Sequence, residues 1–121
     1  MRGVRGATTV TQDTEVEIFA AVQEMLQKIC TVNGIMAKDI VAVIFSVTKD
    51  IKAAFPAAGA RALPDFANVP LIDVQQMEVT GSLAHCIRVL MLVNTEKEQI
   101  EMKHVYLQAA KKLRPDLSDH F

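Results

Sequence analysis

The segment that most restricts the possible folds of this chain is residues 40–47, IVAVIFSV. The run is apolar on both faces of a strand, so we expect a central β-strand that is covered on both sides. It is far too short to cross a bilayer. Half of the 121 residues are hydrophobic, which is enough for one core with apolar surface to spare. The length therefore predicts a single domain, residues 1–121.

A long amphipathic helix over about residues 14–32 is the expected cover for one face of that strand. Thr14 and Glu17 have the spacing of a capping box, in which each side chain satisfies a free amide at the start of a helix. Asn33-Gly34 provides the left-handed exit with which such a helix ends. Apolar residues at helical spacing form one stripe that faces the core: Ile18, Val22, Met25 and Ile29.

The other segments predict further strands and one short helix. Pro56 suits a first helical position, and the Ala-rich residues after it can form about two turns before residues 63–65 stop them. Strands are expected at 2–8, 69–79, 85–94 and 103–107, with a charged loop at 94–101 and a polar tail that frays. The pattern indicates an α+β fold, with a mixed, mostly antiparallel sheet and one long and one short helix packed on it.

Charge and cysteine content exclude several classes of partner. The formal net charge is −1 with no cluster of Lys and Arg, so we expect neither nucleic acid nor a membrane as partner. No signal-type segment opens the chain, and Cys30 and Cys86 form no disulfide framework, which predicts a reduced, cytoplasmic setting.

Common site motifs are also missing. His85 and Cys86 are adjacent and would point to opposite faces of a strand, while His104 and His120 are interpreted as surface histidines, so no metal site is expected. There is no GxSxG motif, P-loop or dinucleotide fingerprint. An enzyme built from this chain would work by positioning and electrostatics, without a cofactor.

The strand HCIRVLMLVN, residues 85–94, carries one residue that does not suit a core. Arg88 shares a face with Cys86, Leu90 and Leu92. In one interpretation the strand lies at the edge of the sheet and Arg88 extends its methylenes to reach water. In the other, Arg88 lines a cavity that holds an anion. For an isolated arginine the edge strand is the better explanation.

Arg5 repeats the anomaly in the first strand. It lies in RGVRGATT between Gly3 and Gly6, whose missing side chains let something approach the backbone. Two arginines in two predicted strands favour a shared cavity over two unrelated surface arginines. A buried guanidinium needs an acidic partner, and the sheet segments offer only Asp73 and Glu78. The expected partner is therefore an anionic ligand.

Three further residues are ambiguous from the sequence alone. The single tyrosine, Tyr106, either caps the edge of the core with its hydroxyl in water or contacts a ligand. Arg61 and Arg114, taken alone, are interpreted as solvated surface charges.

Several separated segments closely resemble the small trimeric chorismate mutases of the pseudo-barrel α/β class. They are RGVRGATTV (2–10), VIFSVTKDIKAAFPAAGAR (43–61), GSLAHCIRVLMLVNT (81–95) and HVYLQAAKKLRPDL (104–117). The resemblance implies an isomerase that converts chorismate to prephenate, the branch step of aromatic amino acid biosynthesis toward phenylalanine and tyrosine, with no metal or cofactor. It also implies a homotrimer with its active sites in clefts between neighbouring subunits, which would account for the surplus apolar surface.

The resemblance gives the anomalous residues roles. Arg88 would donate to the ether oxygen and to a carboxylate of chorismate, where charge develops during the reaction. Arg5 and Tyr106 would bind carboxylate oxygens, Arg5 through a bidentate fork. The remaining substrate-binding residues would come from the Ala-rich segment of the adjacent subunit, the strand near residue 74 and the tail: Phe55, Arg61, Ile72, Asp73, Val74, Gln75, Gln76, Leu113 and Arg114.

The sequence departs from the family at the position that contacts the substrate hydroxyl. Gln76 stands there in place of a glutamate, so the amide oxygen can accept the hydrogen bond but the charge is missing. Asp73 replaces a cysteine of some members and could supply the missing carboxylate, and Ala58 replaces a lysine. We expect an active but weakened mutase with Arg88, Arg5 and Gln76 as its catalytic residues.

Two other functions are compatible with the same residues. One is a non-catalytic trimer that binds chorismate or a related dicarboxylate as a sensor or partner subunit, which Gln76 keeps open. The other is a small trimeric α+β family with an arginine in an intersubunit cleft, acting on imines or keto acids. That family is not expected to carry both the RGxRGA start and the CIRV strand.

Overall fold

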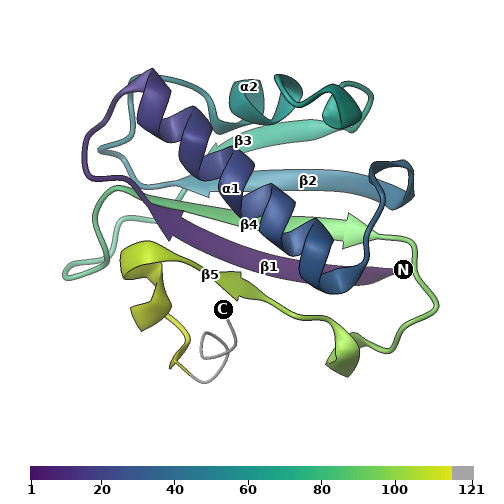
Figure 1. Cartoon of the computed structure of the whole chain (residues 1–121). Helices are drawn as coiled ribbons and strands as arrows, with labels where there is room; N and C mark the ends of the chain where they lie inside the picture. The colour runs from purple at the N-terminus through teal and green to yellow at the C-terminus, as the bar shows by residue number, and fades with distance from the viewer. Residues whose placement is uncertain (116–121) are drawn as a thin grey trace.

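In the computed structural model, which describes residues 1–115, the chain folds into two α-helices and one five-stranded sheet (Figure 1). In chain order the elements are β1 (Arg2–Thr9), α1 (Glu15–Asn33), β2 (Ile40–Val47), α2 (Pro56–Arg61), β3 (Leu71–Gln75), β4 (Cys86–Val93) and β5 (Val105–Tyr106). Short 3-10 helices lie in the connections: η1 (Ala37–Asp39), η2 (Pro64–Phe66), η3 (Gln99–Glu101) and η4 (Gln108–Lys112). No helix in this part of the chain is long and apolar enough to cross a membrane.

The sheet has the strand order β3-β2-β4-β1-β5. β4 runs antiparallel to both of its neighbours, whereas β3 is parallel to β2 and β5 is parallel to β1. The predicted α+β fold with a mixed sheet is therefore confirmed. β2 has the predicted bounds, but β3 is shorter than the predicted strand 69–79 and β5 has only two residues. Part of the predicted tail, residues 116–121, lies outside the described residues.

α1 crosses one face of the sheet (Figure 1), and its predicted apolar stripe is fully buried there. The Thr14 hydroxyl accepts a hydrogen bond from the Glu17 amide at 3.2 Å, as the capping box predicts. The other half of the box is wrong, because the Glu17 carboxylate accepts bonds from Thr11 and from the Gln12 amide instead. Gly34 takes the expected left-handed conformation, with φ at 63°, and ends the helix.

The opposite face of the sheet is only partly covered, and we call it the open face. Ile72, Ile44 and Leu90 lie side by side on it across three strands, and Val74 follows Ile72 along β3. Ile72 is 56% exposed, Val74 44% and Leu90 38%. The expectation that β2 is covered on both faces is therefore wrong for a single chain. What remains is an exposed apolar surface, a feature that often marks contact with another protein.

The C-terminal segment covers one side of the open face, beyond β1. η4 packs there over a small apolar cluster that is separate from the main core. Its members are Ala7, Cys86, Tyr106 and Ala110, with Leu83 and Leu113 packed against them. The main core lies on the α1 side of the sheet, so the two clusters are divided by the sheet.

Gly6 lets other elements of the chain pack closely on β1. A Cβ there would lie 3.0 Å from both Ile29 Cδ1 and Val89 Cγ1 and 3.1 Å from the Val105 carbonyl oxygen. The space beside this glycine is thus filled by α1, β4 and β5, and not by a ligand. A side chain at this position would push β5 away from the sheet.

Candidate active site

Arg88 lies in the middle of the sheet, because β4 is flanked by β2 and β1. The edge-strand interpretation is therefore wrong. Arg88 is half-buried on the open face, directly opposite Ser46 on one side and Ala7 on the other. Its Nε is buried and has no hydrogen-bond partner among residues 1–115. A buried donor without a partner lowers the stability of the fold. An acceptor atom of a bound ligand would satisfy the Arg88 Nε–H.

Arg5 and Tyr106 share the open face with Arg88. Arg5 pairs with Leu90, two residues from Arg88, so the two arginines are diagonal neighbours with backbones about 7 Å apart. Tyr106 is buried and lies level with Arg88, with Ala7 between them. Within residues 1–115, no carboxylate lies within 4.0 Å of either guanidinium. The open face therefore holds two cations without a carboxylate partner in the described chain. Arg88 is half-buried but Arg5 is exposed, so the expectation of a buried guanidinium is wrong for Arg5 in a single chain.

Gln76 continues the alternation of β3 beyond the strand's last residue. Its amide donates to the Val47 carbonyl at 2.8 Å, which keeps it in register, so its side chain lies on the same side as Val74 and Arg88. Gln76 Oε1 is buried without a partner among the described residues. The open face thus presents an unsatisfied acceptor as well as the unsatisfied donor of Arg88.

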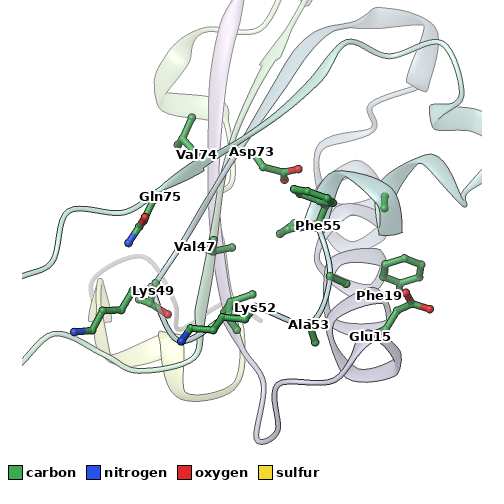
Figure 2. Close-up of a pocket in the computed structure, with 15 residues that line it drawn as sticks. Glu15, Phe19, Val47, Lys49, Lys52, Ala53, Phe55, Asp73, Val74 and Gln75 are labelled. Carbon is green, nitrogen blue, oxygen red and sulfur yellow. The ribbon is translucent and has the colours of Figure 1, made fainter.

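A second group of predicted residues lines a cavity of about 570 Å³ at the β3 edge (Figure 2). Its wall includes Phe55, Asp73, Val74 and Gln75, and Phe55 is 70% exposed at the rim. Lys52 lies at the same cavity (Figure 2). The volume is in the range of small-molecule sites.

Asp73 faces α2 and not the open face. Its Oδ1 accepts a hydrogen bond from the Ala57 amide at 3.0 Å. Burial raises the pKa of the Asp73 carboxyl, although that hydrogen bond and the charge of Arg61 oppose the rise. Because Asp73 and Gln76 point to opposite sides of the strand, Asp73 does not take the place of the Gln76 side chain within one chain. A role for Asp73 at a site between subunits stays a prediction.

One chain therefore divides the predicted site into two groups. Arg5, Arg88, Tyr106 and Gln76 lie on the open face, whereas Asp73, Arg61 and Phe55 lie on the α2 side of β3. Of the tail residues, Leu113 packs on the small cluster beside Tyr106, and the charge of Arg114 acts on His104. Ile72 is exposed on the open face, beyond Ile44. No single cavity in one chain joins the two groups among the pockets described.

His104 was predicted to be a surface histidine, but it is half-buried beside Arg5. Its Nδ1 accepts a hydrogen bond from the Arg5 backbone amide at 2.9 Å, which extends the pairing of β1 beyond the short β5. Burial and the charges of Arg5 and Arg114 lower the pKa of His104. Period-2 alternation with Tyr106 could have placed His104 on this side of the sheet. Among residues 1–115, no group of three His, Cys, Asp or Glu side chains is placed to hold a metal ion.

The His104→Gln variant is expected to be less sensitive to acid than the wild type. Because the folded pKa of His104 lies below its unfolded value of 6.5, the unfolded chain takes up the proton first. The contribution of His104 to stability is complete above pH 6.5 and is lost as pH falls through the folded pKa. Glutamine can accept the Arg5 bond but does not titrate there. Urea unfolding of both proteins between pH 7 and 5 should show a smaller decline for the variant, and equal declines would contradict the assignment.

The sequence and fold of this chain match those of a known protein family. The family profile for chorismate mutase type I matches residues 1–117. The chain is 46% identical to a chorismate mutase of Bacillus subtilis (strain 168), over 98% of this chain and 93% of that protein. It is 47% identical to a chorismate mutase of Thermus thermophilus, over 97% of this chain and 96% of that one.

A solved structure agrees with this result. A chorismate mutase from Clostridium thermocellum superimposes with a TM-score of 0.88 at 45% identity, over 91% of this chain and 97% of the other. The family match, the nearly complete coverage and the shared fold all point to the same conclusion. The chain belongs to the chorismate mutase type I family.

Proposed function

We propose that this protein is a chorismate mutase, an isomerase that rearranges chorismate to prephenate. The observation that carries the proposal is the pair of cations, Arg5 and Arg88, which no carboxylate of residues 1–115 neutralises. Chorismate carries two carboxylates and would supply the missing negative charge. Family membership and two named mutases at 46% and 47% identity support the same substrate.

The open face offers the groups that this reaction needs. In the rearrangement the ether C–O bond breaks while a C–C bond forms in the same molecule, so no proton or electron has to leave the substrate. Negative charge grows on the ether oxygen, where the free Nε–H of Arg88 would donate. Arg5 and Tyr106 would hold the carboxylates and thereby select the compact conformer that reacts. The free Gln76 Oε1 would accept from the substrate hydroxyl.

The active form is a homotrimer in this proposal, with each site shared by two subunits. In such an assembly neighbouring subunits would cover the exposed apolar residues of the open face, which supports association of several copies of the chain. A neighbouring subunit would bring its Phe55, its Arg61 and its cavity-lining residues 73–75 to the Arg88 of the first. Light scattering on the purified protein should give three times the chain mass of 13.3 kDa, and a monomer at assay concentration would contradict this.

An absorbance assay tests the activity directly. Purified protein mixed with chorismate should remove the chorismate absorbance and yield prephenate, with saturation kinetics. Binding without turnover would instead favour the non-catalytic alternative, which the matches to named mutases do not favour. Neither binding nor turnover would reject the proposal.

Replacing Gln76 by glutamate is expected to raise kcat/KM by about tenfold, because an ionised acceptor bonds a hydroxyl more strongly than an amide does. Oε1 of this residue is already buried and free, so the new carboxylate needs no rearrangement to reach the ligand. The Met77→Glu variant adds the same charge at an exposed side chain and serves as the control. Unchanged or lower activity of Gln76→Glu would show that the amide is no handicap in this protein.

We further propose a cytoplasmic location and no nucleic-acid or membrane partner. Cys30 and Cys86 are both free thiols, as a reducing compartment would keep them. The net charge of −1 gives no electrostatic basis for binding phosphate backbones.

A further inference from the structure

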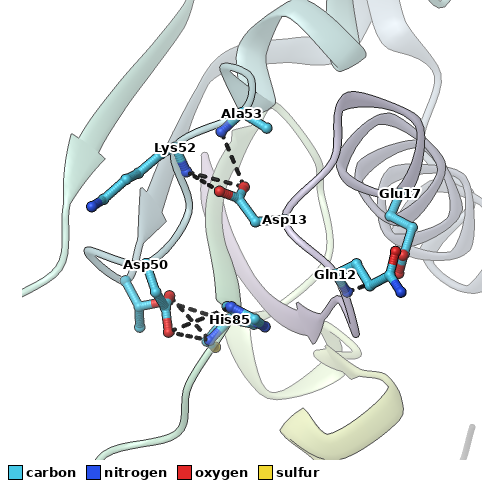
Figure 3. A network of polar contacts seen from close by, with 9 residues as sticks. Gln12, Asp13, Glu17, Asp50, Lys52, Ala53 and His85 are labelled. Carbon is cyan, nitrogen blue, oxygen red and sulfur yellow. Dashed lines mark hydrogen bonds and ion pairs between the residues drawn. The ribbon is translucent and has the colours of Figure 1, made fainter.

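The start of β4 is held by one carboxylate, that of Asp50 in the loop after β2 (Figure 3). The His85 amide donates to Oδ1 of Asp50 at 3.1 Å and to Oδ2 at 3.0 Å. The Thr48 hydroxyl donates to Oδ1 as well, and its oxygen accepts from the Cys86 amide at 3.0 Å. The Thr48–Asp50 pair therefore binds the amide of His85, just before β4, and the amide of Cys86, the first residue of β4.

The backbone at this point depends on that support. His85 has a φ of 49°, in the left-handed region that non-glycine residues rarely adopt. Its carbonyl accepts from the Val10 amide at 3.1 Å, and the Cys86 carbonyl accepts from the Thr48 amide at 3.1 Å. All four backbone polar groups of the two residues are thus satisfied. Without Asp50, the half-buried His85 amide would lose its acceptor and the conformation would lose its anchor.

Arg88 is connected to this anchor through Cys86. The two residues are successive on the open face, and the positive charge of Arg88 opposes the rise in the pKa of the Cys86 thiol that burial causes. Arg88 has no carboxylate partner within residues 1–115, and its Nε is free. With no ion pair in the described part of the chain to hold the guanidinium and no acceptor there for Nε, its position depends on the backbone of β4.

We propose that Asp50 is a positioning residue for the rearrangement: its carboxylate fixes the start of β4 and thereby aims Arg88 at the ether oxygen. The inference rests on the proposed function and extends it to a residue outside the cleft. Asp50 is not among the residues to which the proposal gives a substrate contact, so its loss should mainly affect the transition state. A guanidinium displaced by a fraction of an ångström loses most of its effect on the developing charge and less of its grip on a carboxylate.

Asp13 provides a matched control in the same network (Figure 3). Its carboxylate accepts from the Lys52 amide through both oxygens at 3.0 Å and from the Ala53 amide at 3.0 Å. It therefore holds the same loop with the same kind of bond, but it makes no bond to β4 among the described residues. Removing either carboxylate should lower stability in a similar way.

The experiment measures kcat, KM and urea unfolding for the wild type, Asp50→Ala, Asp50→Asn and Asp13→Ala with chorismate as substrate. Asp50→Ala should lower kcat by about thirtyfold and change KM by less than about threefold, whereas Asp13→Ala should keep kcat within about twofold. Asp50→Asn retains one carbonyl oxygen as acceptor, so its kcat should lie between those of the wild type and Asp50→Ala.

A wild-type kcat in both Asp50 variants, with stability reduced as in Asp13→Ala, would overturn the inference and leave the proposed function intact. A rise in KM at unchanged kcat would overturn it too. If Asp50→Ala fails to fold, the same comparison is made with Asp50→Asn. A wild-type protein that leaves chorismate unchanged would reject both the inference and the proposed function.

Discussion

The Arg88→Ala variant should lose at least about a thousandfold in kcat/KM for chorismate while its free energy of unfolding stays the same or rises. Removing one donor to a developing oxyanion costs a hundredfold to a thousandfold in kcat, and charged donors lie at the upper end. Stability should not fall, because Arg88 makes no ion pair with residues 1–115 and its Nε is unsatisfied. Catalytic residues that are left without partners in the free enzyme lower its free energy of unfolding but stabilise the transition state. Initial rates and urea unfolding measure the two quantities.

Arg2→Ala is the matched control, because Arg2 is also a strand arginine but has partners. Its Nε donates to the Lys97 carbonyl at 2.8 Å and its guanidinium pairs with Glu98 at 3.4 Å. We expect unchanged activity and a loss of stability below about 1 kcal/mol, as is usual for an exposed pair. An Arg88→Ala variant that retains more than about a tenth of the activity would contradict the role of Arg88.

The elements with strong local patterns could be predicted from the sequence. The α1 stripe, the left-handed exit at Gly34 and the bounds of β2 all follow from periodicity and end signals. β3 was predicted too long because apolar residues, Met77 and Val79, continue after the partner strand has ended. β2 stops at Val47, and Thr48 then pairs with Cys86 of β4, so residues after Gln76 have no strand to join.

The site could be predicted residue by residue but not as an arrangement. The alternation of β4 identified Arg88 as anomalous, yet its neighbours depend on the strand order, which no local pattern encodes. Asp73 and Gln76 are three residues apart, and strict alternation would have placed them on opposite sides. Asp50 and His104 were missed because their roles depend on backbone amides that are distant in sequence.

A mixture of two inactive variants is expected to recover activity if the site is shared between subunits. Arg88 lies on the open face, whereas Arg61 ends α2 and acts on Asp73 on the other side of β3. In the proposed trimer each site takes Arg88 from one subunit and Arg61 from the next. Arg88→Ala trimers and Arg61→Ala trimers should therefore both be defective at every site, Arg61→Ala by about a hundredfold through loss of a carboxylate contact.

Co-refolding the two variants in equal amounts from denaturant is the most direct test of this account. In randomly assembled rings about one interface in four receives Arg88 from one subunit and Arg61 from its neighbour, so about a quarter of the wild-type activity should return. Variants refolded separately and then combined without exchange should show only the average of the two parents. The same low average after refolding together would contradict a site shared between two copies of this chain.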